Sequence, residues 1–241
     1  MEKKNNLVEN TLCIICAKGN SEGLPKKNMR LINKKPLINY AIDKAKANKF
    51  KYICISTQSN KIIDLAKKNS INVFFKRSKI LCRRNIPKLL VWKDAIKRSE
   101  IYFNKKFKYV LDIEVTNPLI DKFDLKKFLD EFYIKRKNYD GQFCITDAKK
   151  NPYFNMLEIK KGKFTISKKI NKDITARQGA PKVYEHVAGL YMFKKKYILE
   201  TNNFLNGKLN GFKVSMLKSF DIDGILDFKL VELLLKNNKK L

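Results

Sequence analysis

The chain has 241 residues, of which 44% are hydrophobic, and its formal net charge is +30. This length and apolar fraction favour one folded domain over a disordered chain, and no apolar run approaches the roughly 20 residues that a membrane helix needs. The first ten residues lack the apolar segment of a secretory signal, so we expect a cytoplasmic protein without a membrane partner.

Apolar, β-branched runs alternate with amphipathic segments over the first 150 residues. The runs read as strands at residues 11–17, 51–57, 71–75, 108–115 and 141–147. Helical spacing of apolar residues marks 36–49, 60–69, 87–103 and 123–137. Such alternation predicts an α/β fold with a mostly parallel, doubly wound sheet, whose ligands bind beyond the carboxyl ends of the strands.

The pattern changes between residues 148 and 188. A hairpin is expected to turn at Lys161–Gly162, followed by an extended arm over 171–187. Strands are expected at 188–193 and 212–218, and a helix at 224–237 closes the pattern. An insertion that cannot cover itself often packs on another subunit. We therefore predict a single domain over 1–241 in which 148–188 is an arm for homodimerisation.

The positive charge and the cysteines indicate little about the function of the protein. Basic patches attract phosphate backbones, but Lys and Asn are scattered through every segment, so we expect no specific nucleic-acid partner. The five cysteines are an odd number, and Cys13 and Cys16 have no second pair to complete a zinc site. We expect buried thiols there.

The loop that follows the first strand could bind an anion. Gly19 and Gly23 permit positive φ and close backbone approach to a ligand, and Lys18, Lys26 and Lys27 supply cations. The loop matches neither a P-loop nor a dinucleotide fingerprint. On composition alone, a solvated turn is an equal alternative.

Asp221 and Asp223 follow an expected strand, and residues two apart in extended chain share a face. Two carboxylates on one face repel unless a proton or cation lies between them, and Mg²⁺ is commonly held by one or two carboxylates together with water and substrate phosphates. The alternative is that Asp223 caps the final helix. His186 is the only histidine, and no G-x-S-x-G elbow accompanies it.

The stretch "AKGNSEGLPKKNMRLINKKPL" (17–37) resembles the opening signature of the acylneuraminate cytidylyltransferases, approximately A-R-x-x-S-K-x-x-x-x-K-N followed by Gly-Lys-Pro-Leu. Lys18 and Glu22 depart from it, standing where the family has arginine and lysine. Four further segments resemble the family in order. They are 55–77, "TNPLI" (116–120), "RQGAPKVYEHVAGLYMF" (177–193) and "SFDIDGILD" (219–227), with Ile120 and Val187 as departures.

The resemblance implies a nucleotide-diphospho-sugar transferase-like fold and a reaction in which CMP from CTP is joined to the anomeric hydroxyl of a sialic-acid-like sugar, with release of pyrophosphate. It implies Lys27 and Asp223 as catalytic residues, and Asp221 and Asp223 as Mg²⁺ ligands. The implied CTP-binding residues are Ala17, Lys18, Gly19, Asn20, Ser21, Asn28, Arg77 and Lys88. The implied sugar-binding residues are Glu114, Thr116, Arg177, Gln178, Tyr184, His186 and Tyr191, of which Arg177 and Gln178 would reach a neighbouring subunit's site.

Three alternatives stay open. The acidic sugar could be a legionaminic, pseudaminic or 3-deoxy-octulosonic acid. The departures at Glu22, Ile120 and Val187 could instead mark a nucleotide-binding paralogue without catalysis. A basic nucleic-acid-binding protein is the third, although the chain lacks a recognisable reading motif.

Overall fold

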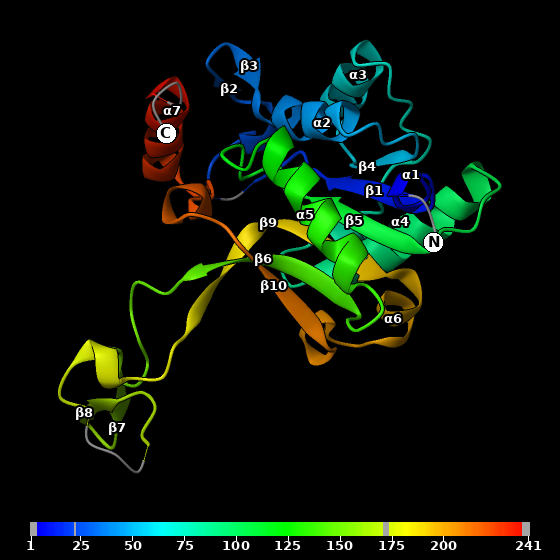
Figure 1. Ribbon diagram of the computed structural model, residues 1–241. Coiled ribbons are helices and arrows are strands. Elements are labelled where there is room, and N and C mark those ends of the chain that lie inside the picture. The colour runs from blue at the N-terminus through cyan, green and yellow to red at the C-terminus, as the bar shows by residue number, and fades with distance from the viewer. Residues whose placement is uncertain (1–3, 22, 171–173, 238–241) are drawn as a thin grey trace.

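The computed structural model describes residues 4–21, 23–170 and 174–237. One mixed sheet forms the centre of the molecule (Figure 1), with strand order β10-β6-β9-β5-β1-β4. Its strands are β1 (Thr11–Cys16), β4 (Ile53–Ser56), β5 (Tyr109–Ile113), β6 (Gly141–Asp147), β9 (Tyr184–Lys194) and β10 (Leu209–Lys213). β4, β1 and β5 are parallel, as are β6 and β10, whereas β9 runs antiparallel to both of its neighbours.

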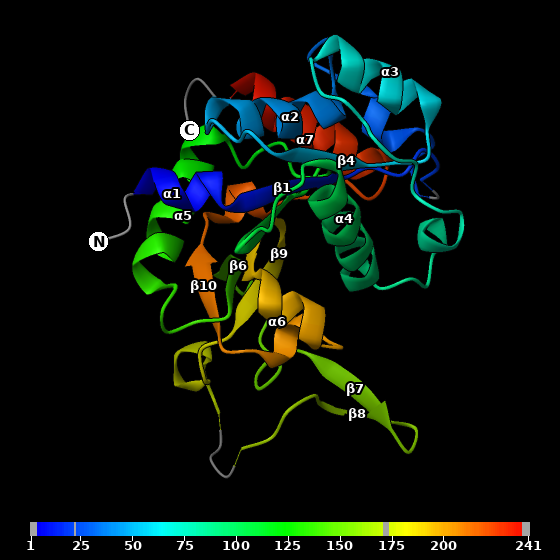
Figure 2. The same ribbon diagram turned by 90° about the vertical axis from the view of Figure 1, so that its right-hand side faces the viewer.

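Helices cover both faces of this sheet (Figure 2). They are α1 (Lys4–Glu9), α2 (Leu37–Ala47), α3 (Asn60–Lys68), α4 (Lys88–Tyr102), α5 (Lys122–Lys135), α6 (Lys195–Glu200) and α7 (Ile225–Asn237). Alternate residues of β1 show the two layers: Cys13 and Ile15 pack in the cluster of α2, α5 and α7, and Leu12 and Ile14 in the cluster of α4 and α6. The predicted doubly wound α/β fold is confirmed.

Two strand predictions were wrong. Residues 71–75 form no strand; instead the Phe74 ring stacks on Tyr102 at 4.1 Å between centroids and meets Phe103 edge-on at 5.4 Å. The strand expected at 212–218 lies earlier, at Leu209–Lys213, and Met216–Ser219 is a 3₁₀ turn. Helices α1 and α6 were not predicted.

The hairpin turns where expected. Strands β7 (Leu157–Lys160) and β8 (Lys163–Ile166) are joined by Lys161 and Gly162, which both have positive φ, at 50° and 74°. Figure 1 shows this hairpin away from the central sheet. Within the described residues, neither core cluster includes a side chain from 148–186. The end of the expected extended arm belongs to β9, which begins at Tyr184, and residues 171–173 lie outside the described residues.

A second short hairpin, β2 (Leu31–Ile32) with β3 (Lys35–Pro36), precedes α2. In the ranges that the structure describes, no helix is both long and apolar enough to cross a lipid bilayer. All five cysteines are free thiols. Of the two that were expected to be buried, Cys13 is buried, but Cys16, at the end of β1, is only partly buried. Cys54 and Cys144 are buried as well.

Candidate active site

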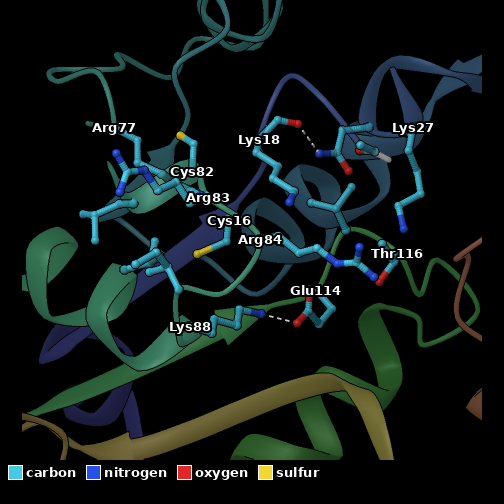
Figure 3. A pocket seen from close by; sticks show the side chains of 16 residues that line it. Cys16, Lys18, Lys27, Arg77, Cys82, Arg83, Arg84, Lys88, Glu114 and Thr116 are labelled. Carbon is cyan, nitrogen blue, oxygen red and sulfur yellow. Dashed lines mark hydrogen bonds and ion pairs between the residues drawn. The ribbon is translucent and has the colours of Figure 1, made fainter. Parts of the chain in front are cut away.

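A cavity of about 250 Å³ opens at the carboxyl ends of β1, β4 and β5, where ligands of parallel sheets bind (Figure 3). From the described part of the chain, six cationic side chains reach it: those of Lys18, Lys27, Arg77, Arg83, Arg84 and Lys88. Glu114 is the one carboxylate among the lining residues of the described chain. Such a cavity attracts an anionic ligand. Its remaining lining residues are Cys16, Ser21, Asn28, Leu81, Cys82, Ile86, Val91, Val115 and Thr116.

The loop after β1 is held by its own polar groups. The Ala17 amide donates to the Ser56 carbonyl at 3.0 Å, which extends the parallel pairing with β4 by one residue. The buried Asn28 side chain donates to the Lys18 carbonyl at 2.8 Å, so that both ends of the loop are fixed to each other. The loop is therefore an anchored part of the cavity wall, in contrast to the solvated turn that was the alternative.

The glycines of this loop serve a different purpose from the predicted one. Among the described glycines only Gly162 has positive φ, so the positive φ that Gly19 and Gly23 permit is not used. A Cβ on Gly23 would lie 2.4 Å from the Asp223 carbonyl oxygen, and one on Gly19 would lie 2.7 Å from the Ser59 Cβ. Both glycines let the loop approach neighbouring protein segments. Glu22, between them, lies outside the described residues.

The loop also contacts the Asp221–Asp223 segment through Lys27. Its Nζ lies 3.3 Å from Asp223 Oδ1 and donates to the Ile222 carbonyl at 2.5 Å. The Ile222 amide in turn donates to the Thr116 carbonyl at 2.9 Å. The Lys27 side chain is 13% exposed and that of Asp223 is 81% exposed, so the ammonium is sheltered while the carboxylate faces solvent. Lys27 and Asp223, the two predicted catalytic residues, are thus neighbours.

The carboxyl groups of Asp221 and Asp223 interact electrostatically. Partial burial raises the pKa of the Asp221 carboxyl, and the negative charge of Asp223 raises it further. The described residues contain no group of three or more His, Cys, Asp or Glu side chains that could hold a metal. Two hard oxygen donors with mutual repulsion fit a magnesium ion that takes its other ligands from substrate phosphates and water.

The alternative role for Asp223, as a cap of α7, is filled by Asp227. Its Oδ2 accepts from the Gly224 amide at 2.7 Å and from the Asp223 amide at 3.0 Å. Asp227 is the third residue of the helix, from which a carboxylate can reach back to the amides before the first turn. Within the described chain, the carboxylate of Asp223 is therefore left to face Lys27 and solvent.

Lys88 is paired with two carboxylates at the floor of the cavity. Its Nζ lies 2.5 Å from Asp112 Oδ2 and also forms an ion pair with Glu114, drawn in Figure 3. Burial raises the pKa of Asp112 to about 6, although the charge of Lys88 opposes this shift. Burial alone would lower the pKa of Lys88, but the two carboxylates raise it above its ordinary value. Lys88 is thus a charged group whose charge is already matched.

His186 and Tyr191 pack behind this ion cluster. The Tyr191 ring centroid is 5.2 Å from Lys88 Nζ and 5.4 Å from the His186 ring, which also meets Phe143 edge-on. Partial burial lowers the pKa of His186. Neither of these two predicted sugar-binding residues is part of the cavity lining.

Several predicted residues lie away from this cavity. Ala17 is buried at the end of the strand, and Gly19 and Asn20 line a separate hollow with Lys26, Gln58 and Ser59. Tyr184 is on the arm side of β9, and Arg177 donates to the Ala148 carbonyl at 2.7 Å, with Gln178 beside it in a 3₁₀ turn. The cavity therefore gathers Lys18, Ser21, Lys27, Asn28, Arg77, Lys88, Glu114 and Thr116 out of the predicted set.

Sequence reasoning missed the segment from Leu81 to Ile86 and the buried Asp112. The signal for this segment was the basic run "CRRN" (82–85), which lies between the expected strand at 71–75 and the expected helix at 87–103. The signal for Asp112 was a carboxylate between apolar neighbours in "VLDIEV" (110–115). A central strand buries such a side chain, and a buried carboxylate requires a charged or hydrogen-bonding partner.

Fold and site together define a nucleotide-binding α/β protein with a cationic cavity beside a carboxylate pair. The family model described as "Cytidylyltransferase" matches residues 12–241. The chain belongs to the cytidylyltransferase family and is therefore a CTP-dependent nucleotidyltransferase.

Individual relatives agree with this assignment. The chain is 40% identical over 225 residues to CMP-N,N'-diacetyllegionaminic acid synthase of Campylobacter jejuni, covering 93% of this chain and 94% of the relative. It is 38% identical over 226 residues to post-translational flagellin modification protein B of Campylobacter coli, with the same coverage, 93% and 94%. The solved structure of CMP:2-keto-3-deoxy-manno-octonic acid synthetase complexed with CTP superposes with a TM-score of 0.67 at 12% identity, covering 95% of this chain and 99% of that chain, which shows the fold alone. The resemblance to the acylneuraminate cytidylyltransferases is confirmed at the level of the family.

Proposed function

We propose that this cytidylyltransferase joins CMP from CTP to the anomeric hydroxyl of a nonulosonic acid and releases pyrophosphate. The cationic cavity between the loop after β1 (residues 17–28, the β1 loop) and Thr116 is the observation that supports nucleotide binding. The sugar is proposed from the name of the relative that is 40% identical, a synthase of CMP-N,N'-diacetyllegionaminic acid. A legionaminic-type acid is therefore the first sugar to test, with sialic, pseudaminic and 3-deoxy-octulosonic acids beside it.

Side chains of the protein would position the triphosphate and stabilise the charge that develops on it. Lys18 and Asn28 would hold the triphosphate, and Lys27 would stabilise the charge that develops at the α-phosphate while Ile222 and Asp223 keep its ammonium in place. The sugar hydroxyl oxygen forms a bond to the α-phosphorus, the bond to the β-phosphate oxygen breaks, and the hydroxyl proton leaves to solvent.

Asp221 and Asp223 would hold Mg²⁺. When bound, the ion would neutralise phosphate oxygens and make a bound hydroxyl more acidic. The raised pKa of Asp221 supports this role, because an added cation relieves the repulsion between the two carboxylates.

The sugar would lie toward Glu114 and Thr116. Glu114 is fixed by Lys88 and by its amide, which donates to the Gly189 carbonyl at 2.9 Å. A fixed carboxylate can accept hydrogen bonds from sugar hydroxyl or amide donors, and it disfavours a second carboxylate at the same place. The acid group of the sugar would consequently point away from Glu114.

We also propose a homodimer formed through the 148–188 arm. Cross-strand partners Ile159 and Phe164 are 68% and 73% exposed, and Leu157 on the same face is 59% exposed. A two-stranded hairpin with an uncovered apolar face gains stability by burying that face on a partner. In such a dimer Arg177, Gln178 and Tyr184 would approach the partner's cavity. A cytoplasmic location stays a prediction from the sequence.

The deciding experiment incubates the purified protein with CTP, Mg²⁺ and a panel of nonulosonic acids while pyrophosphate release is measured. Release with one sugar, abolished in Asp223→Asn, would support the proposal and identify the substrate. CTP binding without release for any sugar would favour a paralogue without catalysis. Absence of CTP binding, together with salt-sensitive retention on DNA, would favour the nucleic-acid alternative instead.

A further inference from the structure

One charged side chain on the core face of α2 lies outside the active-site cavity. Lys44 follows Leu37 by seven residues and Ala41 by three, so the helix places it among buried apolar residues. Lys44 is 4% exposed, and its Nζ donates to the backbone carbonyl of Asn117 at 3.0 Å. Removal from water lowers the pKa of the Lys44 ammonium to about 8. Because a buried ammonium costs free energy, stability does not explain why a lysine stands at this position.

The carbonyl that accepts this hydrogen bond belongs to the turn between β5 and α5. Asn117 is completely buried, and its side-chain Nδ2 donates to the Lys218 carbonyl at 2.9 Å. The neighbouring Thr116 carbonyl accepts from the Ile222 amide at 2.9 Å. Two hydrogen bonds therefore fix the segment from Lys218 to Ile222 to this turn, and Lys44 holds the same turn through a third.

Lys44 supports the turn from the side that faces away from the active-site cavity. Thr116 lines the active-site cavity, whose volume is about 250 Å³. Lys44 instead lines a separate cavity of about 360 Å³, together with Pro118 and Ile120 of the turn. Because Lys44 does not line the active-site cavity, any effect of its ammonium on the reaction has to pass through the turn.

We infer that Lys44 is a positioning residue, whose ammonium holds the turn 116–120 and, through the turn, sets the place of the segment that carries Asp221 and Asp223. This role rests on the proposed function, in which that segment holds Mg²⁺ beside the triphosphate. Ile222, between the two carboxylates, is the residue whose amide is bonded to the turn. A turn that is held less firmly would let both carboxylates shift, and a shift of about 1 Å can cost about 100-fold in rate. Lys44 thus affects turnover without touching the substrate.

The first test replaces Lys44 by Met, which keeps a long unbranched side chain in the core and removes the ammonium. Lys44→Met should lower kcat/KM about 10- to 100-fold. Its urea unfolding midpoint should equal or exceed that of wild type, because a buried charge is gone. Lys46→Met is the matched control, since Lys46 is exposed on the same helix and its loss should change neither quantity. If Lys44→Met keeps the wild-type kcat/KM, or loses activity only in proportion to unfolded protein, Lys44 is not a positioning residue.

A second readout needs no turnover. Hydrogen exchange of the Ile222 amide, measured by NMR, reports the hydrogen bond between the turn and the carboxylate segment. Lys44→Met should speed exchange at Ile222 several-fold, while amides of β1 and β5 at the centre of the sheet should exchange as in wild type. Exchange at Ile222 that stays at the wild-type rate would overturn the inference and leave the proposed function intact. If wild type turns over no sugar, the proposed function fails, and the exchange rate still decides whether Lys44 holds the turn.

The titratable groups around Lys44 leave its ammonium as the one that changes charge near pH 8. The carboxylates and the thiol that act electrostatically on it are those of Glu114, Asp121, Asp124 and Cys144. The cavity beside it also contains Lys35, Tyr40, Asp43 and Lys122. Carboxylates ordinarily titrate well below pH 7 and lysines near pH 10. Burial raises the pKa of the Cys144 thiol to about 12 and raises the pKa of Tyr40 above its ordinary value.

A pH profile therefore separates the charge of Lys44 from its bulk. The measured quantity is the ratio of kcat/KM in wild type to kcat/KM in Lys44→Met, in which the groups common to both proteins cancel. This ratio should fall several-fold as pH rises from about 7 to about 9.5, because a neutral amine donates a weaker hydrogen bond than an ammonium. A ratio that is constant over this range would show that the charge of Lys44 has no role in the reaction, and the inference would be wrong.

Discussion

Gly23 lies so close to Asp223 that a Cβ on the glycine would be 2.4 Å from the aspartate's carbonyl oxygen. The loop after β1 and the carboxylate segment are therefore packed backbone to backbone, although Gly23 and Asp223 are 200 residues apart in sequence. The distance between the predicted phosphate-binding residues and the predicted magnesium ligands depends on this contact.

We expect Gly23→Ala to reduce kcat/KM by about 10- to 100-fold, because misplacing reacting groups by about 1 Å can cost that much. Steady-state kinetics measures the loss. Gly224→Ala is the matched control, since its Cβ would meet Asp227 at an ordinary 3.7 Å. Equal activity of the two variants would show that the close contact does not set the geometry of the site.

Replacing Lys27 by Ala should lower kcat/KM by about 10²- to 10³-fold, the usual effect of losing one preorganised charge in such a site. Its effect on stability should be small, because its partner Asp223 is 81% exposed and exposed ion pairs contribute about 0–1 kcal/mol. Kinetics and thermal unfolding measure the two effects. Lys67→Ala removes the same charge from an exposed position on α3 and should change neither. Unchanged turnover in Lys27→Ala would remove Lys27 from the mechanism.

The parts of the site that were predictable are those that follow directly from strand ends. The family resemblance assigned Lys27 and Asp223 to one site. The strand pattern agrees, because Lys27 lies in the loop after β1, Asp223 follows β10, and the carboxyl ends of parallel strands share an edge. The pairing of Lys88 with Asp112 could not be predicted, since the first residue of a helix and a residue within a strand meet only through tertiary packing.

The errors in strand prediction also have physical causes. Residues 71–75 have the composition of a strand, but Phe74 is stabilised by stacking on Tyr102 rather than by pairing. The sequence of β10 has a low propensity to form a strand because it contains Asn210 and Gly211. The Asn210 side chain is nevertheless satisfied there, since it donates to Gln142 at 2.7 Å and to Glu131 at 2.8 Å. Intrinsic strand propensity does not account for side-chain hydrogen bonds of this kind.

The arm offers a test of assembly. Phe164→Asp places a charge on the apolar face of the hairpin, and burying a Phe contributes about 1.5–3 kcal/mol, so dimer affinity should fall by at least about 10-fold. Sedimentation velocity over a range of concentrations measures the fall. Lys163→Asp is the control, because Lys163 pairs with Lys160 on the opposite face, where a carboxylate meets a cation. A wild type that is monomeric at all concentrations would contradict the proposed dimer.

The buried Asp112 predicts how stability changes with pH. Burial raises the pKa of this carboxyl from 3.8 to about 6, so between these values the folded chain binds more protons than the unfolded chain. The Asp112 contribution to the free energy of unfolding is therefore greatest below the lower value and decreases as pH rises toward 6, by at most about 3 kcal/mol. In Asp112→Asn this decrease should be absent while all other titrating groups remain. Urea unfolding of both proteins between pH 4 and pH 8 measures the difference. If the two stability profiles run parallel over this range, Asp112 does not titrate there, and its ion pair with Lys88 must keep it charged throughout.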